Sequence, residues 1–191
     1  NLENNEIPFP IVAKSLMGSK GIGNYLLSNE DQLRNWVSSR VNRLDNYIFE
    51  KYMSYQLEYR LHVTKLGYFY SCRKALRLDS PDQDKWRRHK DNSVWLLEAN
   101  KDFNKPNSWD DIVNSCVKAL TVIGADILSF DVKVQNSRTP KGEDRDYQKY
   151  ILLECNSASS LANPNGDEVS ICAEKYLEII PQLIKEKNNN V

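Results

Sequence analysis

Cysteine is scarce in this sequence, and its few cysteines are not spaced as metal ligands or as a disulfide framework. Cys72, Cys116, Cys155 and Cys172 lie far apart among 191 residues and form no CxxC pair. Cys155 and Cys172 stand among apolar neighbours and are predicted to be small core residues. A chain of this size without a secretory signal and with such cysteine usage favours a reducing compartment, so a cytoplasmic protein is expected.

The sequence also has no excess charge of one sign and no long apolar run. Lys plus Arg and Asp plus Glu number 26 each, so nothing indicates a nucleic-acid-binding surface or an acidic tail. No apolar stretch approaches the roughly 18 residues of a membrane span. Internal repeats are not visible either. A chain of this length can bury a substantial core in one domain or in two small lobes.

Short apolar runs predict strands, and three stretches with helical periodicity predict helices. The strand-like runs are Phe9–Leu16, Asn24–Leu27, Asn46–Tyr52, Glu58–Lys65, Tyr68–Leu76, Val94–Ala99, Ile127–Gln135 and Tyr150–Asn156. One helix is expected after a Ser28 cap, and a second between a Ser108 cap and Gly124. The third covers about Glu168–Lys187, where Pro181 should kink or split it. Hairpin-linked strands with helices between groups of them predict an α+β fold.

A glycine-rich loop joins the first two expected strands. Gly18, Gly21 and Gly23 lie in "AKSLMGSKGIGNYLL", which is neither a Walker A loop nor a GxGxxG turn. Protein kinases use a glycine-rich loop between two strands to cover nucleotide phosphates, because backbone N–H groups can approach phosphate where no Cβ intervenes. Lys14, just before the loop, could reach the same phosphates. The alternative is a flexible hairpin beside a solvated lysine.

Two carboxylates interrupt apolar strands towards the C-terminal end. Asp131 interrupts "ILSFDVKV", and Glu154 interrupts the run Tyr150–Cys155, which is expected to be buried on both faces. If the two strands form an antiparallel hairpin, Asp131 lies beside Glu154, with Asn156 one pleat further along. Carboxylate and amide oxygens suit Mg²⁺ and not zinc. The alternative is that Asp131 ends a strand and Glu154 pairs with a lysine such as Lys133.

The middle strands carry polar side chains on alternate positions. Glu58, Arg60, His62 and Thr64 share one face of their strand, which fits either solvent or a polar ligand cleft. The next strand adds Arg73 and Lys74 within hydrophobic surroundings, and arginine suits bidentate contact with phosphate or carboxylate. The two histidines of the chain are predicted to be surface residues or satisfied by a neighbour, without a mechanistic role.

The order of these motifs resembles the ATP-grasp superfamily of carboxylate–amine ligases. The lysine and glycine loop of "FPIVAKSLMGSKGIG" are followed by "FEKYM", "EYR", "CRK", "FDVKV" and "LLECNSASSL". The series is similar to the glutamate-ligase and D-alanine–D-alanine ligase branches, and most similar to viral and bacterial members with an EYR…RK pattern. The resemblance implies an ATP-grasp fold whose two α+β lobes hold a nucleotide between antiparallel sheets. Residues 1–53 would form the small lobe with the glycine-loop lid, and residues 54–191 the large lobe with the metal site. The family's N-terminal domain is expected to be absent from this chain.

The resemblance also implies a set of site residues. The nucleotide-binding residues would be Lys14, Ser19, Gly21, Gly23, Glu50, Lys51, Tyr52, Met53 and Glu58. The metal ligands would be Asp131, Glu154 and Asn156. The catalytic residues would be Arg73, facing the γ-phosphate and the acyl-phosphate intermediate, and also Arg60 and Arg87, in that pocket or against an acidic substrate.

Within this set the resemblance assigns particular contacts. Lys14 would contact the ATP phosphates, under the closing glycine loop. Glu50 and Lys51 would lie against adenine, whose edge would pair with backbone near Tyr52 and Met53. Glu58 would hold the ribose hydroxyls. The chain departs from the family pattern in two places: Ser129 stands two residues before Asp131, where many members have an arginine, and "SASS" follows Asn156, where a small residue and proline are usual after Asn-Ser.

The implied reaction joins a carboxylate to an amine at the expense of ATP. It needs no protein nucleophile, in agreement with the lack of a Ser-His or Cys-His constellation. The cofactors would be ATP and one or two Mg²⁺ ions, with Mn²⁺ as an alternative ion. The partners would be a small-molecule or peptide carboxylate and an amine acceptor, with no nucleic acid or membrane, and a homo-oligomer is compatible with this. Two alternatives are an ATP-dependent kinase on the same scaffold and a nucleotide-binding module without turnover.

Overall fold

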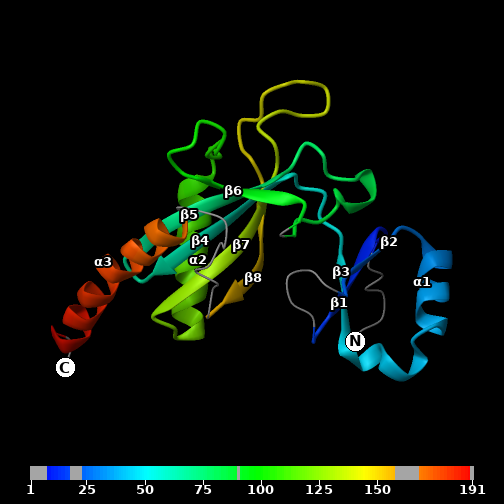
Figure 1. Ribbon diagram of the computed structural model, residues 1–191, viewed down its shortest axis with the longest axis horizontal. Helices are drawn as coiled ribbons and strands as arrows, with labels where there is room; N and C mark the ends of the chain where they lie inside the picture. Colours follow the sequence, from blue (N-terminus) through cyan, green and yellow to red (C-terminus); the bar gives the residue numbers. More distant parts are fainter. Residues whose placement is uncertain (1–7, 18–22, 90, 158–167, 190–191) are drawn as a thin grey trace. The chain divides into compact units, whose positions relative to one another are not determined.

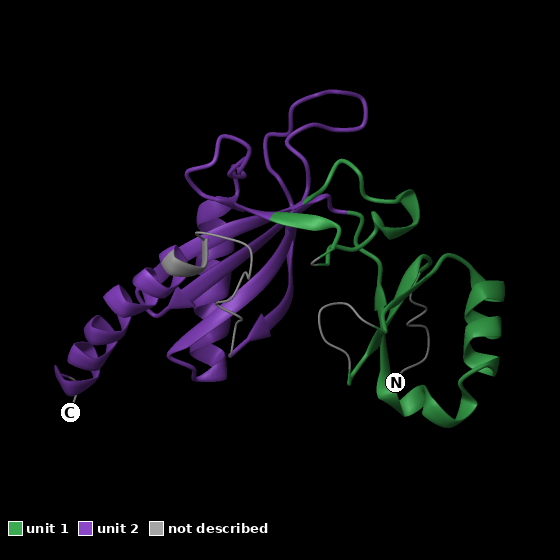
Figure 2. Ribbon diagram, in the orientation of Figure 1, with its two compact units in different colours: residues 1–54, 76–94 green, residues 55–75, 95–191 purple. Residues whose placement is uncertain are grey.

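The computed structural model describes residues 8–17, 23–89, 91–157 and 168–189 and divides the chain into two compact units (Figure 1, Figure 2). Unit 1 consists of residues 1–54 and 76–94, and unit 2 of residues 55–75 and 95–191. The first break lies one residue after the expected boundary between residues 53 and 54. Residues 76–94, expected in the large lobe, belong to unit 1, because the chain returns to that unit between two strands. A local sequence pattern carries no signal for such a return.

Unit 1 contains a three-stranded antiparallel sheet and one α-helix. The elements are β1 (Ile11–Ser15), β2 (Tyr25–Leu27), α1 (Glu30–Ser38), the 3₁₀ helix η1 (Val41–Asn46) and β3 (Tyr47–Lys51), and the strand order is β2-β1-β3. Ile11, Ala13 and Leu27 pack against Trp36 of α1. The period of two along β1 and β3 therefore gives the sheet an apolar face towards α1, and places Lys14 and Glu50 on the other face together with Val12 and Ile48.

The predicted cap of α1 was one residue early. Asn29 is the N-cap, and its side-chain oxygen accepts a hydrogen bond from the backbone N–H of Gln32 at 3.0 Å. The Gln32 side chain in turn accepts from the backbone N–H of Ser28 at 2.8 Å. These two hydrogen bonds satisfy exposed backbone N–H groups at the start of the helix. The pattern requires a glutamine three residues after the cap, and Gln32 stands three residues after Asn29.

Unit 2 is built on the five-stranded sheet with the order β6-β5-β4-β7-β8 (Figure 1). The elements are β4 (Leu57–Thr64), β5 (Gly67–Leu76), the 3₁₀ helix η2 (Asp82–Asp84), β6 (Ser93–Leu97), α2 (Trp109–Ile123), β7 (Ile127–Val134), β8 (Tyr150–Asn156) and α3 (Glu168–Asn189). Of these, the last residue of β5, the whole of η2 and the first two residues of β6 belong to unit 1. β4 pairs antiparallel with β5 and β7, and β7 pairs antiparallel with β8. The predicted α+β class is confirmed.

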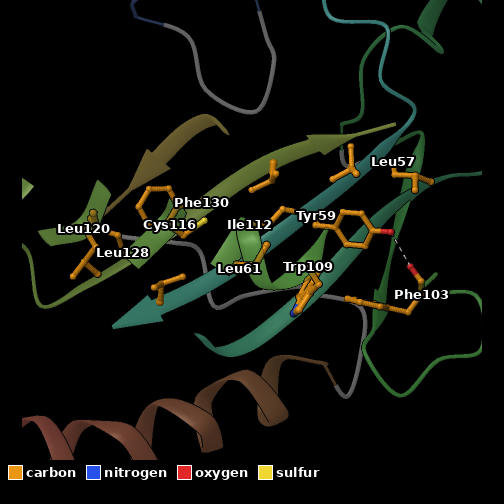
Figure 3. Close-up of a cluster of buried hydrophobic side chains, with 13 residues drawn as sticks. Leu57, Tyr59, Leu61, Phe103, Trp109, Ile112, Cys116, Leu120, Leu128 and Phe130 are labelled. Atoms are coloured by element: carbon orange, nitrogen blue, oxygen red, sulfur yellow. Dashed lines mark hydrogen bonds between the residues drawn. The ribbon is translucent and has the colours of Figure 1, made fainter. Parts of the chain in front are cut away.

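The core of unit 2 lies between α2 and one face of this sheet (Figure 3). Tyr59 and Leu61 of β4 lie opposite Val132 and Phe130 of β7, and all four are almost fully buried. The Tyr59 hydroxyl donates to the backbone oxygen of Phe103 at 3.2 Å, which satisfies the buried polar tip. Because the alternate residues of both strands point the other way, the second face of the sheet carries polar side chains.

The helices of unit 2 follow the sequence with two differences. α2 begins after Ser108 as expected, but the Ser108 hydroxyl donates to the Gln148 backbone oxygen at 2.7 Å and does not cap the helix. α2 ends at Gly124, whose φ of 76° is left-handed. α3 runs through Pro181 without being split. No helix among the described residues has the length and apolarity to cross a membrane.

Candidate functional site

The register of β7 and β8 places the predicted metal ligands together. Asp131 lies directly opposite Glu154, and Ser129 directly opposite Asn156. Directly opposed residues of an antiparallel pair project from the same face, with Cβ atoms about 5 Å apart. The Asn156 amide nitrogen donates to Glu154 Oε1 at 3.4 Å. No group of three or more His, Cys, Asp or Glu side chains converges among the described residues, so a cation here would depend on the amide oxygen, water and a ligand for its other contacts.

The prediction that Tyr150–Cys155 is buried on both faces is wrong. The first four residues of β8 are half-buried, whereas Glu154 and Cys155 are exposed. β8 is the outer strand of the described sheet and has a neighbour on one side only. Glu154 therefore carries no large desolvation cost, and the case for a cation site rests on the cross-strand register.

Asp131 is held by an arginine that the sequence did not pair with it. Arg60 lies opposite Asp131 across β4 and β7, and its Nε and Nη2 donate to the two carboxylate oxygens at 2.6 and 2.7 Å. The side chains are only 18% and 12% exposed. A bidentate pair uses one lone pair of each oxygen, so Asp131 retains acceptor capacity for a cation.

The surroundings of Arg60 keep its charge in place. Burial acts to lower the pKa of Arg60, but the hydrogen bond to Asp131 and the negative charges of Asp131 and Glu154 raise this pKa above its ordinary value. The guanidinium carbon also lies 5.2 Å from the centre of the Trp95 ring, within the range of a cation–π contact. Arg60 thus joins both carboxylates electrostatically and packs on an aromatic surface.

Lys74 and Trp95 belong to this polar face and were missed as site residues. Cys72 lies opposite Arg60, so Lys74, two residues on, shares the face of Arg60. Its ammonium lies 5.4 Å from the centre of the Trp95 ring and 3.8 Å from Glu58 Oε1. The sequence signal for this lysine is the alternation of side chains in "CRK" and "EYR". It identifies Lys74 only when the register between β4 and β5 is known, because that register decides which residue of "CRK" shares a face with Arg60.

The structure does not place Arg73 with the predicted metal ligands. Arg73 lies opposite Tyr59, whose side chain is in the α2-covered core, and Arg73 Nη1 donates to the Asp102 backbone oxygen. Burial raises the pKa of Tyr59 to about 12, with the charge of Arg73 acting in the opposite direction. Arg73 and Lys74 are consecutive in a strand, so only one of them can project from the face of Asp131.

In unit 1, two of the predicted nucleotide-binding residues form an ion pair. Lys14 Nζ lies 2.6 Å from Glu50 Oε2, and the strand register places both side chains on the sheet face away from α1. Lys51 follows Glu50 directly in β3 and therefore projects from the opposite face, so the two cannot lie together against adenine. The Lys14 prediction and the Glu50 prediction remain compatible with a shared ligand.

The remaining predicted residues of unit 1 are placed in part. The Tyr52 backbone N–H donates to the Pro10 oxygen at 2.9 Å and so is not available to pair with an adenine edge, whereas Met53 follows the end of β3. Ser19 and Gly21 lie outside the described residues. Gly23 has a φ of 81°, and a Cβ there would come within 3.1 Å of the Ser15 Cβ, so a larger residue would be strained.

At its far end the polar face of unit 2 is covered by α3. His62 is 2% exposed, and its Nδ1 lies 2.8 Å from the Tyr176 hydroxyl of α3. Burial and the positive charge of Arg60 lower the pKa of His62 to about 4, with Asp131 acting in the opposite direction. His62 is therefore uncharged at neutral pH and hydrogen-bonded to a neighbour, which is one of the two alternatives predicted from the sequence.

The buried neutral histidine makes stability depend on pH. In the unfolded chain its pKa is about 6.5, so between about pH 6.5 and 4 the unfolded state binds a proton that the folded state does not. The free energy of unfolding should fall by about 2–3 kcal/mol on this account when the pH is lowered from 7 to 4.5. Urea unfolding of wild type and His62→Gln measures the difference.

Tyr176→Phe is the matched control for this pH dependence. It removes the hydrogen bond to His62, at a cost of about 1 kcal/mol at every pH, but leaves the burial and Arg60 that lower the pKa of His62. We expect the wild-type slope in this variant and a shallower slope in His62→Gln. Equal slopes in His62→Gln and wild type would contradict the prediction.

Comparison with known proteins identifies the fold. No family model matches the chain, and no curated protein matches it by sequence. Solved structures do match. D-alanine–D-alanine ligase from Bacillus anthracis, complexed with ATP, is 12% identical with a TM-score of 0.59, over 97% of this chain and 57% of that one.

Two further matches are an ATP-grasp ligase and a biotin carboxylase domain. The ATP-grasp ligase PsnB, complexed with a phosphomimetic variant of its minimal precursor, Mg and ADP, is 15% identical with a TM-score of 0.51, over 88% of this chain and 46% of that one. The biotin carboxylase domain of the 2-oxoglutarate carboxylase of Hydrogenobacter thermophilus, complexed with MgADP, ADP and bicarbonate, is 17% identical with a TM-score of 0.52, over 87% of this chain and 37% of that one.

The chain therefore has the ATP-grasp fold, and the fold that the order of its motifs implied is confirmed. It spans about half, or less, of the length of the structures that it matches. At identities of 12–17% the likeness concerns the fold, and activity and substrates have to be argued from the residues of this chain.

Proposed function

We propose that this chain carries the nucleotide- and magnesium-binding centre of an ATP-dependent carboxylate–amine ligase. The observation that supports this most strongly is the cross-strand pair of Asp131 and Glu154, with Asn156 beside it, on the polar face of an ATP-grasp sheet. The solved structures of this fold noted above were obtained with ATP, with Mg and ADP, or with MgADP. The same class of ligand is proposed here.

The donor chemistry of these three residues fits Mg²⁺. Carboxylates and an amide oxygen are hard ligands, and Mg²⁺ keeps several waters and phosphate oxygens as its other ligands. Glu154 is exposed at the outer strand and Asp131 is oriented by Arg60, so one ligand is accessible and the other is preorganised. When bound, Mg²⁺ would offset part of the negative charge of the phosphates.

The remaining charged residues of the chain would position the nucleotide. In unit 1, Lys14, oriented by Glu50, is proposed as a phosphate contact. In unit 2, Lys74 is proposed to supply a positive charge from the polar face. Glu58, which is 8% exposed and near Lys74, keeps the proposed contact with the ribose hydroxyls. Fixed charges of this kind stabilise a transition state because little reorganisation is needed when charge develops.

The proposed reaction has two displacement steps. An oxygen of the substrate carboxylate attacks the γ-phosphorus of ATP, the bond to the bridging oxygen breaks, and ADP leaves with that electron pair. An amine then attacks the carbonyl carbon of the resulting acyl phosphate, loses a proton, and inorganic phosphate leaves as the amide forms. No side chain of the protein is consumed, so positioning and charge stabilisation are its contribution.

The direct test measures ADP release with candidate carboxylates and amines, together with mass detection of an amide. The expected result is ADP formation that depends on both substrates and on Mg²⁺, with one amide formed per ADP. A phosphorylated product without an amide would instead indicate a kinase. Tight binding of MgATP without ADP formation under any substrate pair would indicate a binding module, and either result would overturn the ligase proposal.

A neighbouring pair of residues in β5 gives a matched test of the site. Lys74→Gln is expected to lower the rate of ADP formation by about 10- to 100-fold, because it removes a charge from the proposed phosphate environment. Arg73→Gln removes a charge of the same sign one residue away, but from the opposite face of the sheet. It should leave the rate within about twofold of wild type.

This assignment would be refuted by the reverse pattern. If Arg73→Gln were the severely impaired variant and Lys74→Gln nearly normal, the resemblance-based assignment of Arg73 would be right. Circular dichroism and urea unfolding of both variants control for loss of folding.

A further inference from the structure

Unit 1 contains a hollow along the outer edge of its sheet. Its volume is about 630 Å³, and its lining residues are Gly23, Asn24, Tyr25, Leu26, Leu27, Ser28, Gln32, Gln83, Trp86 and Arg87. The first six are consecutive and include the whole of β2. Neither Lys14 nor Glu50, the ion pair assigned to the nucleotide, is part of this lining. Gly23 and Arg87, which the resemblance assigned to the nucleotide and to the reaction pocket, do belong to the lining, whereas none of the proposed cation ligands on β7 and β8 does.

One side of the hollow is a strand edge. In the described sheet the order is β2-β1-β3, and β1 is the only strand beside β2. Alternate residues of an outer strand direct backbone N–H and C=O groups away from the sheet, and these groups can pair with another extended chain. A small ligand would have no need of six consecutive backbone positions, whereas an extended peptide would use them.

The other side of the hollow is a turn that the protein holds in a fixed form. Asn92 is 3% exposed, and its amide nitrogen donates to the backbone oxygens of Asp84 and Arg87 at 3.1 and 3.0 Å. The Tyr52 hydroxyl donates to the Trp86 backbone oxygen at 3.4 Å, and the two rings pack edge to face. These contacts preorganise Trp86 and Arg87, which lowers the entropy cost of binding.

Arg87 sets the charge preference of the hollow. It is the only charged residue among the described residues that line it. Its guanidinium packs 5.4 Å from the centre of the Trp86 ring and contacts Asp84 through one nitrogen at 3.4 Å. A guanidinium has several N–H donors in a planar fork and can bind a second carboxylate alongside such a contact.

From this arrangement we propose that unit 1 binds an extended peptide, which adds to β2 at the outer edge of the described sheet and places a carboxylate against Arg87. The backbone pairing supplies affinity, and the pairing of the carboxylate with Arg87 supplies selectivity. The carboxylate could belong to an acidic side chain or to the C-terminus of the peptide. Peptide binding here does not depend on nucleotide binding, so the two proposals can fail separately.

The test is an NMR titration of the ¹⁵N-labelled chain without nucleotide. The probe is a synthetic heptapeptide of alternating valine and threonine with a central glutamate, acetylated and amidated at its ends. We expect shifts in the backbone amides of residues 25–27 and in the Trp86 indole N–H. A glutamine peptide should bind about fivefold more weakly, which is the effect of one partly exposed ion pair. The same glutamine peptide with a free C-terminus separates a terminal carboxylate from a side-chain one.

Two protein variants and one modified peptide complete the design. Arg87→Gln should abolish the preference for glutamate over glutamine, whereas Arg77→Gln should keep it, because Arg77 is exposed in the same segment and does not line the hollow. N-methylation of alternate peptide nitrogens on the pairing edge should abolish the shifts at residues 25–27. The proposal is overturned if those amides do not shift, if both peptides bind wild type equally, or if succinate binds as tightly as the peptide.

Discussion

Replacement of Asp131 by asparagine is expected to lower the free energy of unfolding by about 3–5 kcal/mol. The change keeps the shape of the side chain but leaves the Arg60 guanidinium, which is 18% exposed, without its bidentate partner. The loss comes mainly from the uncompensated charge, since little of the Arg60 side chain is accessible to water. Urea unfolding at pH 7 measures it.

Two further variants test whether the lost stability comes from the buried, unpaired charge of Arg60. Asp144→Asn breaks another arginine–aspartate ion pair, with Arg138 through its Nε at 3.0 Å, but the Arg138 and Asp144 side chains are 71% and 82% exposed, so the cost should stay below about 1 kcal/mol. The double variant Arg60→Leu, Asp131→Leu removes both charges and should recover most of the stability lost in Asp131→Asn. A single variant as stable as wild type would show that the pair is not buried as described.

Replacement of Glu154 by glutamine is expected to lower the rate of ADP formation by about 10²–10³-fold while leaving stability nearly unchanged. Glu154 is exposed in the outer strand, so its charge contributes little to folding, but it lies opposite Asp131 at the proposed cation site. Glutamine keeps the length and loses the charge that a hard divalent cation prefers.

Glu143→Gln is the matched control, because Glu143 is an exposed carboxylate in the loop between β7 and β8 and lies away from the proposed ligands. It should retain wild-type turnover. Activity in Glu154→Gln equal to that in Glu143→Gln would remove the metal assignment. A drop in turnover accompanied by a large loss of stability would mean that Glu154 has a structural role instead.

Much of the secondary structure could be predicted because it follows from local periodicity. All eight strands and three α-helices occur near their expected positions, and Asp131 meets Glu154 because a charged loop joins their two strands into a hairpin. Chain connectivity alone favours that pairing. The exposure of Glu154 and Cys155 could not be predicted, because it depends on β8 being the outer strand of the sheet.

The partner of Asp131 could not be predicted either, because it also depends on the order of strands in the sheet. Arg60 meets Asp131 only because β4 pairs with β7, a strand that follows it after two further strands and a helix. No local pattern encodes that order. The choice between Arg73 and Lys74 also depends on register, since consecutive strand residues differ only in the face from which they project.

The Arg60 pair gives the candidate site a physical character that the motif series did not imply. A carboxylate bound through both oxygens has one orientation, so the unoccupied lone pairs of Asp131 are directed before any ligand arrives. Trp95 supports Arg60 and Lys74 together, which keeps two positive charges beside the carboxylates. The proposed binding of a cation together with phosphates depends on this arrangement of the polar face.

Calorimetric titration of a non-hydrolysable ATP analogue, with and without Mg²⁺, tests this arrangement most directly. Wild type and Glu143→Gln should bind the analogue with an affinity that Mg²⁺ raises at least tenfold, and Glu154→Gln should lose that dependence on the ion. If Mg²⁺ strengthens binding to the same extent in all three proteins, the ion is held elsewhere and the site on β7 and β8 is not the cation site.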